Sequence, residues 1–147
     1  MKIALIVSRF NEEITAGLLG GAQEALAAAG LRDDDVATFH VPGAFEIPLA
    51  AMHAAESGAF DAVVCLGCVI KGETMHFEYI ADAVANGIMR VGLNTGVPVV
   101  FGVLTTVTEE QAGERSQRGA GNKGAEAARA AVDMARLLPQ LKAQERP

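Results

Sequence analysis

The chain has 147 residues, of which 50% are apolar, and its 12 basic and 18 acidic side chains give a formal net charge of −6. This length predicts a single domain, residues 1–147, that buries a core without disulfides or metals. No basic stripe runs along any predicted helix, which argues against a nucleic-acid partner.

The first segment, MKIALIVSRFN, contains an apolar run that is too short for a signal peptide or a membrane span. It predicts a buried strand at 2–7 and a cytoplasmic protein with no membrane partner. Strand-like and helix-like segments then alternate to the end of the chain. In chain order they are a helix at 13–30, a strand at 36–41, a helix at 44–58, a strand at 60–70, a helix at 74–96, a strand at 98–106, and helices at 108–117 and 122–141.

Local signals mark several helix ends. Gly30 and Gly58 stand where helices commonly stop, and Pro48 fits a first helical turn. Thr108 and Gln111 have the spacing of a capping box. The strands are continuously apolar rather than alternating, which predicts a parallel sheet covered on both faces and an α/β fold. The large apolar fraction also predicts that further copies of the chain cover part of the surface.

The two cysteines, Cys65 and Cys68, lie in the predicted strand 60–70 with C-x-x-C spacing. That spacing is typical of redox or zinc sites. In a strand, however, residues three apart point to opposite faces, so the pair cannot share a disulfide or a metal ion. We therefore predict two buried structural thiols and no metal site.

Ligands of open parallel sheets bind beyond the carboxyl ends of the strands. The four predicted ends carry SRFN, HVPGAFE, the segment 67–76 and TT, and these stretches hold aromatic, glycine and charged residues. Phe10 in the first of them is either a packing plug or a ring on which a flat heterocycle stacks.

The segments after the second and third strands offer groups for a polar ligand. Gly43 and Ala44 form either a tight turn or a set of backbone N–H donors. Glu46 suits a first helical turn because of the helix dipole, and it can equally accept hydrogen bonds from ligand hydroxyls. KGET places Gly72 before a helix start, which is typical of a phosphate site as well as of a solvated turn.

Three basic or titratable residues stand at helix ends. His76 lies in a first helical turn, where a positive charge is disfavoured, so it is expected to be neutral at pH 7 and able to accept a proton. An ordinary surface histidine is the alternative. Lys123 follows Asn122, a suitable N-cap, and Arg115 lies in the preceding helix, so they indicate either an anion site or solvated side chains. The residues thus predict a site for a planar, hydroxylated molecule and a phosphate.

Six segments together resemble the 6,7-dimethyl-8-ribityllumazine synthase family. They span residues 8–128 in the order of the family and read SRFN, VPGAFEIP, LGCVIKGETMHFEYI, VVFGVLTT, EQAGER and GNKGAEAA. The resemblance implies a flavodoxin-like three-layer sandwich with a four-stranded parallel sheet. It also implies a homo-oligomer, a pentamer that in some members assembles further into a hollow shell, with active sites between subunits.

The activity implied by the resemblance is a step of riboflavin biosynthesis. The family condenses 5-amino-6-(D-ribitylamino)uracil with 3,4-dihydroxy-2-butanone 4-phosphate, and the products are 6,7-dimethyl-8-ribityllumazine, phosphate and water. It uses neither a metal nor an organic cofactor. The partners are therefore small-molecule substrates and further copies of the chain.

The resemblance also implies residue roles, carried over by position in the motifs. Phe10 would stack on the pyrimidine ring and His76 would transfer protons. From the neighbouring subunit, Phe101 would close over the ring, Arg115 would pair with the phosphate, and Lys123 would lie near it. The remaining positions are Ala44, Phe45 and Glu46 at the ribityl chain, Cys68, Val69 and Ile70 at the pyrimidine edge, and Glu73 and Thr74 at the phosphate, whereas Lys71 has no assigned role.

Two other functions remain open. One is a flavin- or lumazine-binding protein without turnover, and the other is an enzyme that joins two lumazines, as archaeal-type riboflavin synthases do. The presence of Thr74, His76 and Arg115 favours the synthase over a pure flavin binder. Met1 lies directly before the first strand, whereas family members commonly carry a longer segment there that extends a neighbour's sheet. This difference argues against assembly into a shell but not against the pentamer. The segment from Arg115 to Lys123 has no insertion that would argue against the shell, so the two indications conflict.

Overall fold

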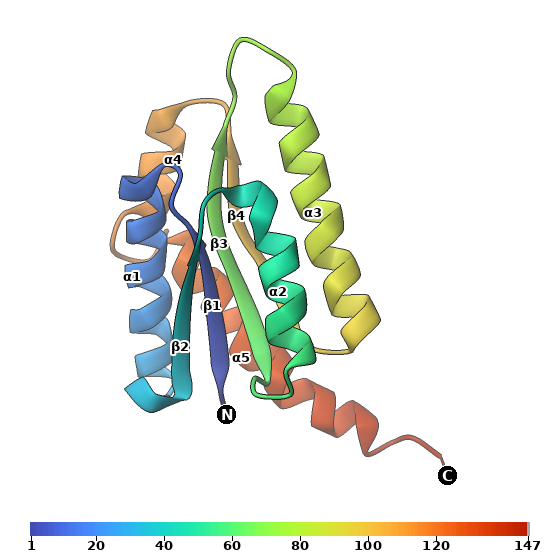
Figure 1. The fold of residues 1–147 in the computed structure, drawn as a ribbon. Coiled ribbons are helices and arrows are strands. Elements are labelled where there is room, and N and C mark those ends of the chain that lie inside the picture. The colour runs from blue at the N-terminus through green and yellow to red at the C-terminus, as the bar shows by residue number, and fades with distance from the viewer. Residues whose placement is uncertain (147) are drawn as a thin grey trace.

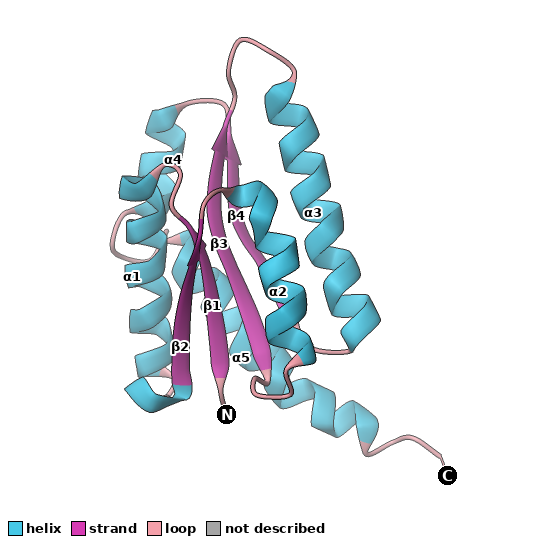
Figure 2. Ribbon diagram, viewed as in Figure 1, coloured by secondary structure: helices cyan, strands magenta, loops and turns pink. Residues whose placement is uncertain are grey.

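The computed structural model describes residues 1–146, and its centre is a four-stranded parallel sheet with helices on both faces (Figures 1 and 2). The sheet confirms the predicted α/β fold. Its strands are β1 (Ile3–Ser8), β2 (Val36–Val41), β3 (Ala62–Ile70) and β4 (Val99–Thr106). The helices are α1 (Glu12–Ala28), α2 (Ile47–Glu56), α3 (His76–Thr95), α4 (Glu109–Ser116) and α5 (Lys123–Lys142), with 3₁₀ turns at Asp33–Asp35 and Ala44–Glu46. Among the residues described, no helix combines the length and the apolar character needed to cross a membrane.

The strand order is β2-β1-β3-β4. β1 pairs with β2 as far as Ser8 and Val41, whereas its pairing with β3 stops at Val7 and Leu66. β3 therefore runs on beyond β1, paired there with β4 alone. The chain leaves β1 towards β2 on one side and returns to β3 on the other. A reversal of this kind opens a crevice at the carboxyl ends of the strands.

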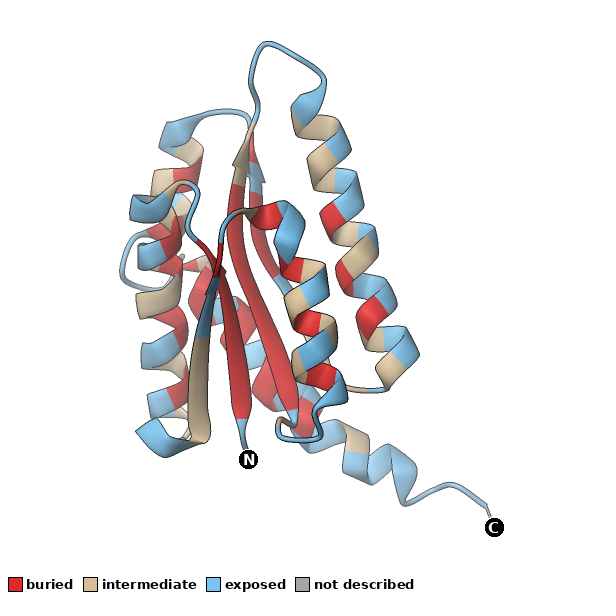
Figure 3. Cartoon of the chain, viewed as in Figure 1, coloured by how far each residue is buried: buried red, intermediate tan, exposed pale blue. Residues whose placement is uncertain are grey.

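The core has two layers, one on each face of the sheet. α1 and α5 cover one face, where Val64 and Leu66 of β3 are buried, and α2 and α3 cover the other, where Val63 and Cys65 are buried. β1 and β3 are therefore buried along most of their length, as Figure 3 shows. β2 is an edge strand and is only partly buried, with Phe39 among its exposed residues.

The predicted helix 44–58 is divided into a 3₁₀ turn and α2. In an α-helix the C=O of Ala44 accepts a hydrogen bond from the N–H of residue 48. Pro48 has no N–H. The N–H of Ile47 donates to Ala44 C=O instead, which is the tighter 3₁₀ pattern. The regular helix therefore begins at Ile47 rather than at Ala44.

The other predicted helix ends are close to those observed. Gly30 has φ 95°, and the N–H groups of Gly30 and Leu31 donate to the carbonyls of Ala27 and Leu26, so α1 ends in a glycine-closed turn as predicted. The predicted helix 74–96 starts two residues later than expected, at His76. Thr74 therefore lies outside the helix, and its Oγ1 accepts a hydrogen bond of 3.3 Å from the N–H of His76.

The predicted cap of α4 is also present. The N–H of Gln111 donates to Thr108 Oγ1 at 3.1 Å. In return, Gln111 Oε1 accepts a hydrogen bond of 2.9 Å from the N–H of Val107, one residue before the N-cap position. The side-chain exchange thus fixes the chain between β4 and α4.

Both cysteines are buried and unpaired. Cys68 belongs to the core layer of α1 and α5, and Cys65 to the layer of α2 and α3, so they point to opposite faces of the sheet as predicted. Burial raises the pKa of the Cys68 thiol to about 11, and it also raises the pKa of the Cys65 thiol. Within residues 1–146, no group of three or more His, Cys, Asp and Glu side chains is arranged to hold a metal ion.

We expect the native thiols to resist alkylation. The thiolate is the reactive form, and a pKa of about 11 leaves about one Cys68 side chain in a thousand deprotonated at pH 8. Iodoacetamide should therefore modify native protein at least about a hundredfold more slowly than protein unfolded in urea. Mass spectrometry of the labelled cysteine peptides measures both rates. Equal rates in native and unfolded protein would contradict the burial of the two thiols.

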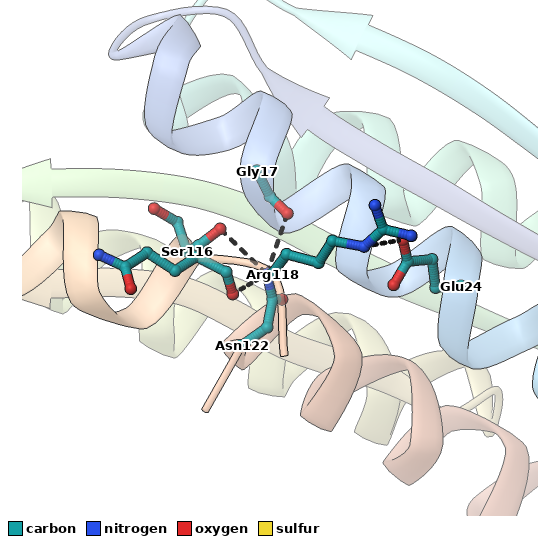
Figure 4. A network of polar contacts seen from close by, with 6 residues as sticks. Gly17, Glu24, Ser116, Arg118 and Asn122 are labelled. Atoms are coloured by element: carbon teal, nitrogen blue, oxygen red, sulfur yellow. Dashed lines mark hydrogen bonds and ion pairs between the residues drawn. The ribbon is translucent and has the colours of Figure 1, made fainter. Parts of the chain in front are cut away.

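Asn122 joins α1, α4 and α5 through its side chain (Figure 4). It is 1% exposed. Its Nδ2 lies 3.0 Å from each of the carbonyl oxygens of Gly17, Ser116 and Gln117. Its Oδ1 accepts the N–H of Ala125 at 3.0 Å and so caps α5. One side chain thus satisfies backbone groups from three parts of the chain.

The contact between α1 and α5 also depends on two glycines, which have no side chain. A methyl group at Gly21 would collide with the Asn122 amide, and one at Gly124 would collide with the backbone of Leu18. Glycine at these two positions lets the helices approach closely. Beside them, Arg118 and Glu24 form an exposed ion pair of 2.9 Å that is also drawn in Figure 4.

Candidate functional site

A cavity of about 540 Å³ opens where β1, β2 and β3 end, at the upper edge of the sheet in Figure 1. It lies at the crevice between β1 and β3, which is the usual ligand position in doubly wound sheets. Residues predicted for the site that line it are Phe10, Ala44, Phe45, Glu46, Cys68, Val69, Ile70, Thr74 and His76.

Two aromatic rings stand beside this cavity. Phe10 is 71% exposed and Phe45 is 61% exposed, although both are large apolar side chains. The packing-plug alternative for Phe10 is therefore wrong, because a plug would be buried. An exposed ring at the wall of a cavity is available for stacking on a flat ligand.

The loop that carries Phe10 is tied to the end of β2. The N–H of Arg9 donates to Val41 C=O at 2.9 Å, and the N–H of Phe10 donates to Pro42 C=O at 3.1 Å. These two bonds continue the pairing of β1 with β2 past the last paired residues. The position of Phe10 is thus set by the sheet rather than by a free loop.

The second strand end supplies a turn and an acid. The N–H of Glu46 donates to Gly43 C=O at 3.2 Å, so Gly43 and Ala44 form the tight turn that the sequence allowed. The turn also starts a helix, where backbone N–H groups lack intrahelical partners. Glu46 is exposed at the start of α2 and lines the cavity, so its carboxylate is free to accept hydrogen bonds.

The segment between β3 and α3 is exposed and forms the loop that rises above the sheet in Figure 1. Its start is anchored by the N–H of Lys71, which donates to Thr106 C=O at 2.9 Å. Thr74 and His76 line the cavity, and His76 lies in the first turn of α3 as predicted, although the helix begins at His76 itself. Glu73 lies in the same loop but is not part of the cavity wall.

The cavity wall contains neither lysine nor arginine. Its ionisable side chains are Glu46, His76, Glu109 and the thiol of Cys68. A phosphate bound there would meet two carboxylates and neither a lysine nor an arginine of this chain.

Three of the four remaining predicted residues line a second cavity of about 370 Å³ along the edge strand β4, whereas Glu73 lines neither cavity. Phe101, Arg115 and Lys123 all lie in its wall, together with side chains of α5. The two cavities share no residue. α5 covers the opposite face of the sheet from α2 and α3 (Figure 1). The structure therefore brings the predicted residues together as two groups rather than one.

Local bonds hold the two cations of the second cavity. Arg115 Nη1 donates to Gln111 C=O at 3.0 Å. Lys123 follows the capping residue Asn122, as predicted, and its Nζ donates to Glu126 Oε2 at 2.8 Å. This hydrogen bond and the charge of Lys123 lower the pKa of the Glu126 carboxyl. Lys123 thus keeps an acidic partner, which offsets its position at the positive end of α5.

Sequence reasoning missed several residues of the first cavity. Phe77 and Ile80 face it from α3, and their i, i+3 spacing is the signal that was available. Asn11 follows Phe10 directly and lines the same wall. Glu109 begins α4, and nothing local in the sequence places it at a cavity formed by the ends of other strands.

The strand order defines a flavodoxin-like α/β protein, and its cavity lies at the carboxyl edge of the sheet, where proteins of this architecture bind ligands. The family model described as 6,7-dimethyl-8-ribityllumazine synthase matches residues 1–139, and the chain belongs to this family. It is therefore a transferase of riboflavin biosynthesis. The resemblance carried by the six sequence segments is confirmed.

Proposed function

We propose that the enzyme condenses 5-amino-6-(D-ribitylamino)uracil with 3,4-dihydroxy-2-butanone 4-phosphate to form 6,7-dimethyl-8-ribityllumazine, phosphate and water. The observation that carries the proposal is the division of the site residues. Rings, a carboxylate and a histidine line the cavity at the strand ends, whereas the cations line the cavity along β4. Two substrates of different chemistry, one flat and hydroxylated and one anionic, match this division.

The first substrate fits the cavity at the strand ends. Its pyrimidine ring would stack on Phe10, which is exposed at the wall. Its ribityl hydroxyls would donate to the Glu46 carboxylate beside the turn at Ala44 and Phe45. The end of β3, Cys68–Ile70, would meet the edge of the ring. The lining of one cavity by all of these residues supports these roles.

The second substrate requires positive charge that this cavity lacks. We propose that Arg115 and Lys123 of a neighbouring copy supply it, with Phe101 of that copy closing over the ring. Arg115 offers a guanidinium, which binds phosphate oxygens in pairs. From the first chain, Glu73 and Thr74 would offer backbone N–H groups of the loop before α3.

An assembly of copies has independent support. A third cavity, of about 530 Å³, lies between α3, β4 and α5, and its wall is almost entirely apolar. Met89 and Leu93 belong to this wall and are exposed in the isolated chain. Exposed apolar surface of this kind marks contacts with another protein surface. We propose a ring of copies, a pentamer as the family resemblance implies, in the cytoplasm.

His76 would move the protons of the reaction. Imine formation, loss of phosphate, ring closure and dehydration each require proton transfer, and an imidazole at the cavity wall lies in reach of them. Holding two reactants in one site contributes a further rate enhancement that does not depend on His76. His76 is therefore expected to assist the reaction rather than to be indispensable.

The direct test is to supply both substrates to purified protein. Formation of the lumazine is followed by absorbance, and the product is identified by mass spectrometry. A protein that binds the lumazine tightly but forms none would be a binding protein. A protein that converts two lumazines to riboflavin would belong to the other enzyme class. Either result would contradict the proposed reaction.

His76→Ala should lower kcat by roughly a hundredfold, which is the low end of general acid–base catalysis. The affinity for the ribityl substrate should stay nearly unchanged, because stacking and hydroxyl contacts do not involve the imidazole. Steady-state kinetics between pH 6 and 8, with binding measured by calorimetry, check both expectations. His53→Ala is the matched control, since His53 is exposed on α2 and outside the cavity wall. Unchanged kcat at every pH for His76→Ala would remove the proton-transfer role.

A further inference from the structure

Asn11 has an unusual backbone conformation. Its φ is 62° and its ψ is 50°, which is left-handed, and among the described residues it is the one non-glycine residue with positive φ. Asparagine tolerates this region better than most residues, but the conformation still costs free energy. Asn11 is also the N-cap of α1, yet its side chain makes no capping hydrogen bond. The usual stabilising contact of an N-cap asparagine is therefore absent.

The side chain of Asn11 makes a long-range contact instead. Its Nδ2 donates to the C=O of Cys68 at 3.2 Å, across 57 residues of sequence. The ladder between β1 and β3 has already ended at Val7 and Leu66. The amide thus links the end of β1 to the end of β3 inside the crevice, where no strand pairing joins them.

Both ends of this link belong to the cavity wall. Phe10 precedes Asn11 and is fixed on its other side by the hydrogen bond to Pro42 C=O. Cys68 begins the stretch of β3 that lines the cavity as far as Ile70. The Asn11 amide therefore sets the spacing between an exposed ring and a strand edge. A planar ligand in this cavity has to stack its face on the ring of Phe10 and place its edge against the end of β3 at the same time.

We propose that Asn11 is a positioning residue for the planar substrate. Its amide holds Cys68–Ile70 against the loop of Phe10. One orientation of the substrate can then stack on Phe10 and place its edge against Cys68–Ile70. The left-handed backbone and the missing cap bond are the structural costs of directing the amide to β3. This inference rests on the proposed function, because it assigns the residue to the pyrimidine subsite and not to the phosphate.

Two variants separate the amide from the backbone conformation. Asn11→Gly removes the amide and keeps the left-handed conformation accessible. Its KM for the ribityl substrate should rise about tenfold, which corresponds to a loss of about 1.4 kcal/mol. Its kcat and its KM for the butanone phosphate should stay within about twofold of wild type. Asn11→Ala should show the same rise in KM and a lower melting temperature, because alanine disfavours positive φ.

The results divide clearly. Wild-type KM values in Asn11→Gly would overturn the positioning role. The positioning role would also be overturned if Asn11→Gly had a lower melting temperature together with either a lower kcat or an equal rise of both KM values. That pattern would indicate damage to the fold. A wild-type protein that forms no lumazine would overturn the proposed function, and this inference with it. In that case the failure is seen before any variant is made.

Discussion

Mixed assemblies of Glu46→Ala and Arg115→Ala subunits should regain about a quarter of wild-type activity, although each variant alone is nearly inactive. Each substitution removes one of the charged contacts proposed for the substrates, so each variant should lose at least about a hundredfold in kcat/KM. Glu46 lines the cavity at the strand ends and Arg115 the cavity along β4. The recovery follows if every site takes one wall from each of two neighbouring copies.

The expected fraction follows from counting. A site is intact when its first wall comes from an Arg115→Ala subunit and its second from a Glu46→Ala subunit. With equal amounts and random reassembly after unfolding, each condition holds for about half of the positions, so about one site in four is intact. The number does not depend on how many copies close the ring.

A second mixture provides the matched control. Wild type mixed equally with the double variant Glu46→Ala/Arg115→Ala should show about a quarter of full activity if walls are shared, and about half if they are not. Wild type unfolded and reassembled alone gives the refolding yield. Mass spectrometry of intact assemblies verifies that subunits have exchanged. Mixed assemblies with no more activity than the mean of their parents would assign Arg115 to another role.

Asn122→Ala should lower the free energy of unfolding by about 3–5 kcal/mol, which is a large part of the stability of an ordinary domain. The substitution removes the cap of α5 and takes the Asn122 donor away from the carbonyls of Gly17, Ser116 and Gln117, of which the bond to Ser116 is buried and the other two are partly buried. The melting temperature should fall by roughly 10 °C. Urea unfolding at one fixed protein concentration measures the change, since the proposed association of copies would also contribute to stability.

Arg118→Ala is the control in the same network. The ion pair of Arg118 with Glu24 is exposed, so its loss should cost less than about 1 kcal/mol. A comparable loss in both variants would mean that the region as a whole, rather than the Asn122 amide, sets the stability. Asn122 also lies between Arg115 and Lys123 in sequence, so, if these two residues bind the butanone phosphate as proposed, Asn122→Ala should weaken that binding as well.

The gathering of Phe10, Glu46 and His76 at one edge was predictable, because parallel strands place all their carboxyl ends on the same side of the sheet. The exposure of Phe10 was not predictable, because the packing of residues far away in the sequence decides whether a loop phenylalanine is exposed or buried. The start of α2 at Ile47 had a local signal that was not used, namely the missing N–H of Pro48. The edge position of β2 also had a signal that was not used, because Thr38 and His40 make VATFHV less apolar than the central strands β1 and β3.

The long-range polar contacts were beyond sequence reasoning. An asparagine before a helix predicts a cap, and Asn122 provides one. Nothing in its neighbourhood indicates that its amide also reaches Gly17. Likewise, Asn11 is a good N-cap by residue type, but its amide is directed to Cys68. In both cases the partner is a backbone carbonyl, which every residue carries, so the sequence does not indicate which carbonyl accepts the hydrogen bond.

The Asn122 amide joins residues that are 105 positions apart. A ribosome adds about 5–20 residues each second, so α1 emerges roughly 5–20 s before its final partner is made. During that interval α1 lacks α5, the neighbour that covers its apolar side. The nascent chain therefore cannot complete this layer until α5 has been synthesised, and a product truncated before α5 would expose α1 to chaperones and proteases.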